Sequence, residues 1–172
     1  GDMFNNCLSL TTLDLTNFDV QNVTAMNRMF DGCRALISVD ISTFVTTSLT
    51  AIGAMFRDCN SLQQIVGDFA NITVSPGSTD FRAVFNGCLA LNALDVSGVD
   101  TSTGVDLGNM FLNCDNLTSI PGVDGFDTSN ATDMSGMFQN CRALTTLDVS
   151  NFNTANVTTM ASMFSDCRNV TS

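Results

Sequence analysis

The amino-acid sequence predicts an α/β solenoid of about six stacked 26-residue units, each made of a short parallel β-strand and a short helical segment. The first observation behind this prediction is the spacing of the cysteines. The seven cysteines recur at intervals of 26 to 29 residues, at Cys7, Cys33, Cys59, Cys88, Cys114, Cys141 and Cys167. The second observation is that two hydrophobic periods alternate within each interval.

A phenylalanine precedes every cysteine by three residues, and methionine precedes that phenylalanine in every copy except the fourth, which has Val84. The repeating motif is therefore Met-Phe-x-x-Cys. The phenylalanines are Phe4, Phe30, Phe56, Phe85, Phe111, Phe138 and Phe164. Identical residues at a fixed period indicate that each copy occupies the same place in a repeated structural unit.

The strand of each unit is predicted from an alternation of apolar and polar residues. In residues 12–16, Leu13 and Leu15 alternate with threonine and aspartate. This period of two is typical of a strand with one buried face. The equivalent segments are residues 38–42, 93–97 and 146–150.

The helical segment is predicted from a spacing of three to four residues between Val23, Met26, Met29 or Phe30, and Cys33. This spacing places side chains on one face of a helix, and Asn22 is well placed as its N-cap. The helix propensity is poor, because asparagine, threonine and aspartate outnumber good helix formers. We therefore expect only a turn or two of helix, held by packing.

One strand and one short helix cannot bury their own apolar face, so the units are expected to stack into a single domain spanning residues 1–172. Apart from Gly104, which replaces an apolar residue in the fourth copy, two copies depart from the repeat. The third contains Val74-Ser75-Pro76-Gly77, which predicts a bulging loop, and the fifth has Pro121-Gly122 in its strand, which predicts a weakened rung. Structural drift is the favoured explanation of both, and a functional role is the alternative.

The motif from Leu10 to Cys33, repeated from Leu144 to Cys167, resembles the bacterial surface leucine-rich repeats of the BspA-like type and the mycoplasma surface-lipoprotein repeat DUF285. The resemblance covers essentially the whole chain. It implies a leucine-rich-repeat-like solenoid outside the cell, usually one segment of a longer surface protein engaged in adhesion or host contact. It implies no particular binding residues.

Composition narrows the function further. All 17 acidic residues are aspartates and all six basic residues are arginines, and the formal net charge is −11. This charge repels phosphate backbones and anionic lipid, so we expect no nucleic-acid partner and no membrane insertion. Histidine, lysine and glutamate are absent, which leaves serine and cysteine without a customary general base, so we expect no enzyme.

Candidate ligand-facing residues occupy the outward positions of the predicted strands. Within them, an acidic row formed by Asp14, Asp40, Asp95 and Asp148 is interrupted by Val66 and Pro121. The full set is Thr12, Asp14, Thr16, Ser38, Asp40, Ser42, Asp95, Ser97, Thr146, Asp148 and Ser150. Calcium binding to the acidic row is an alternative, although the chain has no EF-hand loop. The cysteines are expected to form a ladder of buried thiols, and metal binding or disulfides are the less favoured alternatives.

The leading hypothesis is a noncatalytic extracellular recognition or adhesion module that binds a protein or glycan at a cell surface through its exposed sheet face. The alternative is a structural spacer or shaft of a surface filament or of a virion or phage fibre. The absence of tyrosine and tryptophan favours the spacer. We also expect that the segment is an excerpt of a longer array, flanked by neighbouring repeats or prone to end-to-end self-association.

Overall fold

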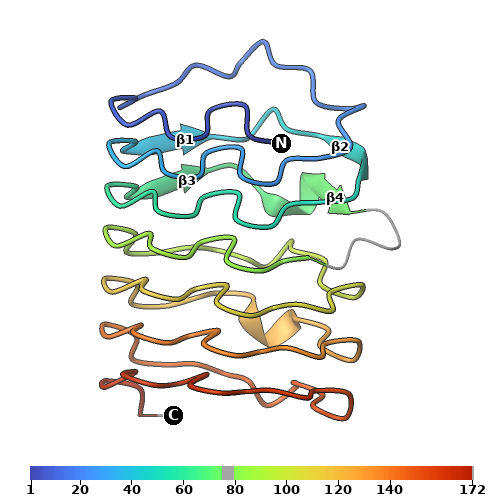
Figure 1. Cartoon of the computed structure of the whole chain (residues 1–172), viewed down its shortest axis with the longest axis vertical. Helices are drawn as coiled ribbons and strands as arrows, with labels where there is room; N and C mark the ends of the chain where they lie inside the picture. The colour runs from blue at the N-terminus through green and yellow to red at the C-terminus, as the bar shows by residue number, and fades with distance from the viewer. Residues whose placement is uncertain (75–79, 172) are drawn as a thin grey trace.

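A computed structural model describes residues 1–74 and 80–171, in which the chain winds through successive coils stacked one on another (Figure 1). The N-terminal coil lies at one end of the stack and the C-terminal coil at the other. The stacking of equivalent units predicted from the repeat is therefore present. The part of the third unit predicted to bulge, around Ser75 to Gly77, lies outside the described residues.

Regular strands form in the second and third coils. Strands β1 (Ser38–Asp40) and β3 (Gln64–Val66) pair in parallel, with Val39 opposite Ile65. Strands β2 (Thr46–Leu49) and β4 (Ile72–Val74) pair in parallel as a second small sheet. In the other coils, equivalent positions meet through isolated parallel bridges, including Ala93 with Ser119.

The prediction of a helical segment in each unit is wrong. Across residues 1–74 and 80–171, the helical elements are two short 3₁₀ turns, η1 (Phe69–Asn71) and η2 (Val123–Gly125). Segments such as residues 26–33 form consecutive tight turns instead. The described residues therefore do not form an α/β solenoid of strand-plus-helix units; they form two small parallel sheets and otherwise turns and extended segments.

The physical reason is a pair of left-handed residues in every copy of the motif, two positions before and two positions after the phenylalanine. In the second copy these are Arg28 (φ 53°) and Gly32 (φ 74°). A left-handed residue cannot continue a right-handed helix. The equivalent pairs elsewhere are Asp2 and Asn6, Ala54 and Asp58, Ala83 and Gly87, Asn109 and Asn113, Gly136 and Asn140, and Ser162 and Asp166.

Hydrogen bonds of two kinds satisfy the backbone of these turns. The N–H of Phe30 donates to the carbonyl of Met55 in the next coil (2.9 Å), and the N–H of Gly32 donates to Arg57 (2.7 Å). Other residues donate within their own coil; for example, the N–H of Cys33 donates to the carbonyl of Phe30 (3.0 Å). The turn segments thus form a ladder between coils, which we call the turn side, without needing a helix.

The core is built from columns of identical side chains. Consecutive phenylalanines of the motif stack nearly parallel, with ring centroids 5.3 to 5.9 Å apart and interplanar angles of 3 to 10°. This phenylalanine column runs from Phe4 to Phe164. Its middle members are fully buried, so the column ties every coil to its neighbours.

The cysteines form a parallel column. Each thiol from Cys33 onward donates to the carbonyl of the phenylalanine in the preceding coil, at 2.9 to 3.2 Å. All seven are free; Cys7 and Cys167 are half-buried and the other five are buried. The prediction of a ladder of buried, unpaired thiols is confirmed for those five.

Candidate functional site

The predicted ligand-facing positions lie on the side of the coils that carries β1 and β3, which we call the strand side. Ser38 is half-buried, and the other ten side chains of the set are exposed. Only residues 38–40 of the predicted strands form a regular strand within the described chain. The segments at residues 12–16 and 146–150 follow the same path without a regular ladder.

Each aspartate of the acidic row is held by its own chain two residues later. The Oδ1 of Asp95 accepts hydrogen bonds from the N–H (2.9 Å) and the hydroxyl (2.6 Å) of Ser97. These bonds from the Ser97 hydroxyl and N–H keep the pKa of Asp95 below its usual value. Asp14 with Thr16, Asp40 with Ser42 and Asp148 with Ser150 make the equivalent backbone bond, at 2.8 to 3.0 Å. These carboxylates are therefore ionised hydrogen-bond acceptors at neutral pH.

Three adjoining hollows form a groove on the strand side. The largest, of about 640 Å³, is lined by residues 119–124 and 146–150. The second, of about 430 Å³, shares Pro121 with the first and is lined by residues 63–65 and 92–95. The third, of about 310 Å³, shares Asp95 with the second and adds Gly67, Asp68 and Ser97. We call the three together the strand-side groove.

Five of the predicted positions line this groove, and six do not. Those in the lining are Asp95, Ser97, Thr146, Asp148 and Ser150. Those outside the lining of these three hollows are Thr12, Asp14, Thr16, Ser38, Asp40 and Ser42. The groove therefore includes the predicted positions of residues 93–97 and 146–150 and none of those of residues 12–16 and 38–42.

The irregular copies contribute directly to the groove. Gly122 is left-handed (φ 86°), and a β-carbon there would lie 2.3 Å from the Cα of Ser97 in the preceding coil. Pro121 still keeps one rung, because its carbonyl accepts the N–H of Val96 (2.8 Å). At Pro121-Gly122, where the repeat is broken, the backbone therefore lies close to Ser97 of the preceding coil. Both residues also line the groove.

The chemistry of the groove is acidic and partly apolar. Among the residues that the structure describes, its lining includes four aspartates, Asp68, Asp95, Asp124 and Asp148, and no arginine. Ile65 and Val149, which are half-buried, and Pro121, which is exposed, contribute apolar surface between them. Such a lining can accept hydrogen bonds from hydroxyl, amide or ammonium donors. In the described parts of the chain, no three cysteine and aspartate side chains are grouped so as to hold a metal ion, so the calcium alternative gains no support.

A second acidic column, on the turn side, was missed in the sequence. Asp80, Asp106 and Asp133 stand five residues before successive phenylalanines and meet through parallel bridges. Burial raises the pKa of Asp106, opposed by a hydrogen bond from the Gly108 N–H and reinforced by the charge of Asp133. The signal was available, because three consecutive units carry aspartate at the same offset.

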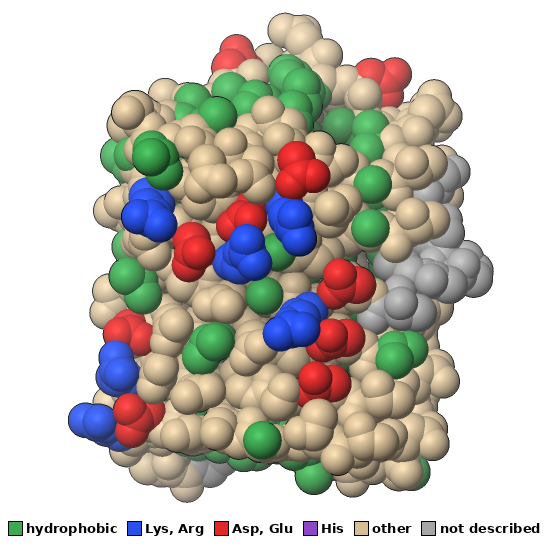
Figure 2. Space-filling view, in the orientation of Figure 1, with side chains coloured by type: hydrophobic (Ala, Val, Ile, Leu, Met, Phe, Trp, Pro, Cys, Tyr) green, Lys and Arg blue, Asp and Glu red, His purple; other side chains and the backbone are tan. Residues whose placement is uncertain are grey.

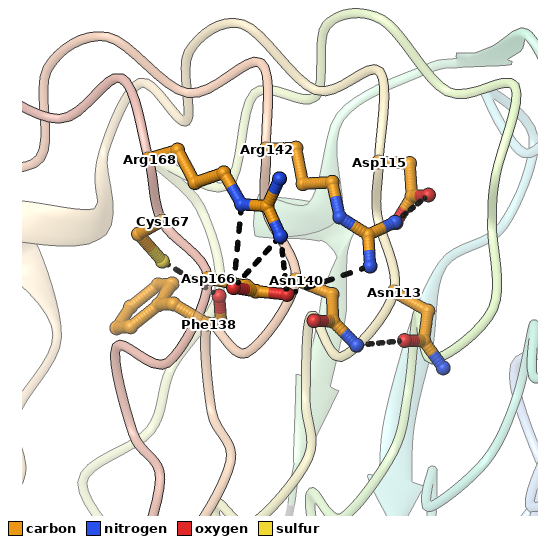
Figure 3. A network of polar contacts seen from close by, with 8 residues as sticks. All are labelled: Asn113, Asp115, Phe138, Asn140, Arg142, Asp166, Cys167 and Arg168. Carbon is orange, nitrogen blue, oxygen red and sulfur yellow. Dashed lines mark hydrogen bonds and ion pairs between the residues drawn. The ribbon is translucent and has the colours of Figure 1, made fainter.

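Arginine–aspartate contacts on the turn side connect coils near the C-terminal end. Arg142 contacts Asp115 at 2.6 Å and Asp166 at 3.6 Å, and Arg168 contacts Asp166 at 3.2 Å (Figure 3). These side chains are substantially exposed, and exposed ion pairs contribute about 0 to 1 kcal/mol each. We assign them a structural role.

No helix in the described residues has the length and apolar character needed to cross a membrane.

The stacked coils, the columns of identical core residues and the groove along one side define a repeat protein. The chain belongs to the family described as "Mycoplasma protein of unknown function, DUF285", which matches residues 1–93 and 79–172. The resemblance to DUF285 seen in the motif is thereby confirmed. A solved structure, the crystal structure of the T. pallidum leucine-rich repeat protein TpLRR, is similar at 18% identity and a TM-score of 0.37. That match covers 83% of this chain and 69% of the other. No curated protein sequence matches the chain significantly.

Proposed function

We propose that this chain is a noncatalytic recognition module of a surface protein, and that it binds a protein or a glycan in the strand-side groove. The observation that carries the proposal is the continuity of the three hollows through Pro121 and Asp95. Five exposed residues with hydroxyl or carboxylate groups converge on them. Concave surfaces with a few fixed polar groups are typical of ligand sites.

A noncatalytic role follows from the titratable groups. A general base works best with a pKa near the operating pH, whereas the pKa of Asp95 is moved below its usual value by Ser97. Ser97 and Ser150 hydrogen-bond to carboxylates, Asp95 and Asp148, whose lowered pKa values suit them poorly to act as a general base. Buried cysteines, whose pKa values are raised by burial, are equally poor nucleophiles.

The proposed location is the outside of a cell, or the surface of a virion. The family match and the motif's resemblance to surface repeats support the cell surface. A net charge of −11 also suits a protein that must not adhere to anionic lipid.

The alternative function is a spacer or shaft within a surface filament or fibre. The unbroken phenylalanine column favours it, because a continuous stack resists bending between coils. Apolar side chains such as Met3 and Phe164 are exposed at the two ends of the stack. A second copy stacked end to end would cover them, which is the form that self-association would take.

The experiment compares two double variants in binding to an array of neutral, sialylated and sulfated glycans and to purified extracellular-matrix proteins. Asp95→Asn with Asp148→Asn removes two charges inside the groove, whereas Asp14→Asn with Asp40→Asn removes two equivalent charges outside it. The groove variant should lose at least about tenfold in affinity, equal to about 1.4 kcal/mol. The control variant should bind like the unchanged protein.

Two results would overturn the proposal. Equal losses in both variants would show that net charge, not the groove, controls binding. If no probe binds with a Kd below about 1 mM, which corresponds to about −4 kcal/mol, the recognition proposal fails and the spacer function is favoured.

A further inference from the structure

A separate hollow on the turn side is surrounded by arginines from three successive coils. Its volume is about 360 Å³. Arg28, Arg57 and Arg82 line it, and the carboxylate of Asp80 lies over Gly53, where a β-carbon would meet it at 2.6 Å. Figure 2 shows arginine and aspartate side chains gathered on this face of the molecule. We call this feature the arginine hollow; it does not depend on the strand-side groove.

One of the three arginines, Arg57, is held in place by a buried carboxylate. The Nε and Nη2 of Arg57 donate to the two carboxylate oxygens of Asp31 at 2.9 and 2.6 Å. The Asp31 side chain is only 6% exposed, whereas that of Arg57 is 40% exposed. The ion pair therefore fixes the Arg57 guanidinium at the edge of the hollow, with N–H groups left to meet a ligand.

Among the described residues, the other two arginines form no close ion pair, although the charge of Arg82 partly offsets the rise that burial causes in the pKa of Asp106. In the parts of the chain that the structure describes, no aspartate oxygen lies within 4.0 Å of a guanidinium nitrogen of Arg28 or Arg82. This differs from Arg142 and Arg168, each of which contacts Asp166. Two guanidinium groups without a close ion pair, beside one hollow, favour an anionic ligand, because planar guanidinium groups bind carboxylates in pairs of hydrogen bonds.

Asp80 limits which anion can fit. It lines the hollow, and its Oδ1 accepts the backbone N–H of Arg82 (2.9 Å). A dianion such as phosphate would meet this negative charge, whereas a hydroxyl group would donate a hydrogen bond to it. The lining therefore suits a ligand that carries one carboxylate and neighbouring hydroxyl groups.

We propose that the arginine hollow binds an acidic sugar, with Arg28 and Arg82 holding its carboxylate and Asp80 accepting a hydrogen bond from one of its hydroxyl groups. Arg57, fixed by Asp31, adds positive charge at the rim. The net charge of −11 does not prevent this, because charges farther away than about 8 Å are screened at physiological salt. Acidic peptides and inorganic anions are the competing ligands that the experiment must separate.

The repeat supplies substitutions that the fold already accommodates. Arg28→Ala copies Ala54, and Arg82→Gly copies Gly53, the residues at the equivalent positions of a neighbouring coil. Asp80→Ala copies Ala51 in the same way. As a control, Arg34→Asn copies Asn60 and removes one positive charge from outside the hollow.

The measurement is an NMR titration that follows the arginine Nε–H signals, with methyl β-glucuronide and the methyl glycoside of sialic acid as probes. Methyl β-glucoside, acetate, inorganic phosphate and an aspartate-serine peptide serve as comparison ligands. At least one acidic sugar should shift the Arg28 and Arg82 signals and bind more tightly than every comparison ligand. Arg28→Ala with Arg82→Gly should weaken this binding at least about tenfold, equal to about 1.4 kcal/mol, and Arg34→Asn should leave it unchanged.

Asp80→Ala distinguishes a sugar site from a general anion site. This substitution should weaken binding of the acidic sugar, because the site loses an acceptor for a sugar hydroxyl. It should strengthen binding of acetate, because the site loses a negative charge that repels it. Tighter binding of phosphate or of the peptide, a gain for all anions in Asp80→Ala, or no shift of the arginine signals with either sugar would each overturn the proposal. Folding of every variant is checked from the backbone amide spectrum.

Discussion

The thiol of Cys88 donates a hydrogen bond to the carbonyl oxygen of Phe56, which lies 32 residues earlier and 3.2 Å away. The same oxygen accepts the backbone N–H of Cys59, in its own coil, at 3.3 Å. One carbonyl group therefore joins the turn of one coil to the side chain of the next. Because this arrangement recurs along the stack, the cysteine column contributes polar bonds as well as apolar volume.

The first prediction concerns alkaline pH. Burial raises the pKa of Cys141 from an ordinary value of 9.0 to about 12, and raises the pKa values of Cys88 and Cys114 well above that ordinary value. Above pH 9 the unfolded chain loses thiol protons that the folded chain retains. The free energy of unfolding should therefore be unaffected by these thiols below pH 9 and should fall above it by about 1.4 kcal/mol per pH unit for each buried thiol.

Urea denaturation between neutral pH and pH 11 measures this slope. The test is clean because lysine, tyrosine and histidine are absent, so cysteines are the side chains that titrate between about pH 8 and 12. Cys141→Ala should reduce the slope by one thiol's share. A flat profile would mean that the thiols are accessible in the folded protein.

The second prediction concerns the phenylalanine column. Phe111 is fully buried and stacks on Phe85 and Phe138, at 5.6 and 5.5 Å. Phe111→Ala should lower the free energy of unfolding by about 3 to 5 kcal/mol, because packing is lost on both sides. Phe164→Ala is the control: Phe164 is 47% exposed and stacks on Phe138 alone in the described column, so its loss should be clearly smaller. Equal losses in denaturation would contradict the column as the main cohesive element.

The third prediction concerns the close approach at Gly122. Gly122→Ala should lower the free energy of unfolding by about 2 kcal/mol or more, because a β-carbon both disfavours φ 86° and meets the backbone of Ser97. Gly125→Ala, three residues later, has no atom within 4 Å of the new β-carbon and should be nearly neutral. Thermal unfolding of the two variants side by side decides the matter; a stable Gly122→Ala protein would show that the coils can separate there at little cost.

The fourth prediction concerns the buried ion pair. Arg57→Ala leaves the carboxylate of Asp31 buried without its main partner and should cost about 1 to 3 kcal/mol of unfolding free energy. Arg142→Ala removes an exposed pair and should cost less than about 1 kcal/mol. If chemical denaturation ranks the two variants in the opposite order, Asp31 is solvated in solution.

The inward-facing columns were predictable from the sequence, but the backbone that carries them was not. Inward residues spaced three to four apart, such as Met26, Met29 and Cys33, fit a helix and a series of tight turns equally well. The distinguishing signal is the residue before each cysteine, which is glycine, asparagine or aspartate in every copy and is left-handed in each, as at Gly32 and Asn113. These are the residues that tolerate that conformation best.

The groove was predictable only in part. Asp95 and Asp148 were found because outward strand positions follow from the period of two. The hollows beside them lie next to Pro121 and Gly67, and at Pro121-Gly122, where the repeat is broken, the sequence alone favoured structural drift. Asp14 and Asp40 carry the same pattern but lie outside the groove, because concavity depends on neighbouring coils rather than on the residue itself.

Phe56 and Phe85 are separated by 29 residues, three more than Phe30 and Phe56, yet their rings lie 5.9 Å apart and within 5° of parallel, against 5.3 Å and 6° for the shorter interval. The stacking of the phenylalanine column therefore hardly changes when three more residues separate two of its members. Gene duplication can lengthen such an array, and insertions can diversify it between the columns, without redesigning the interior. Changes at the surface are therefore separated from the packing of the core.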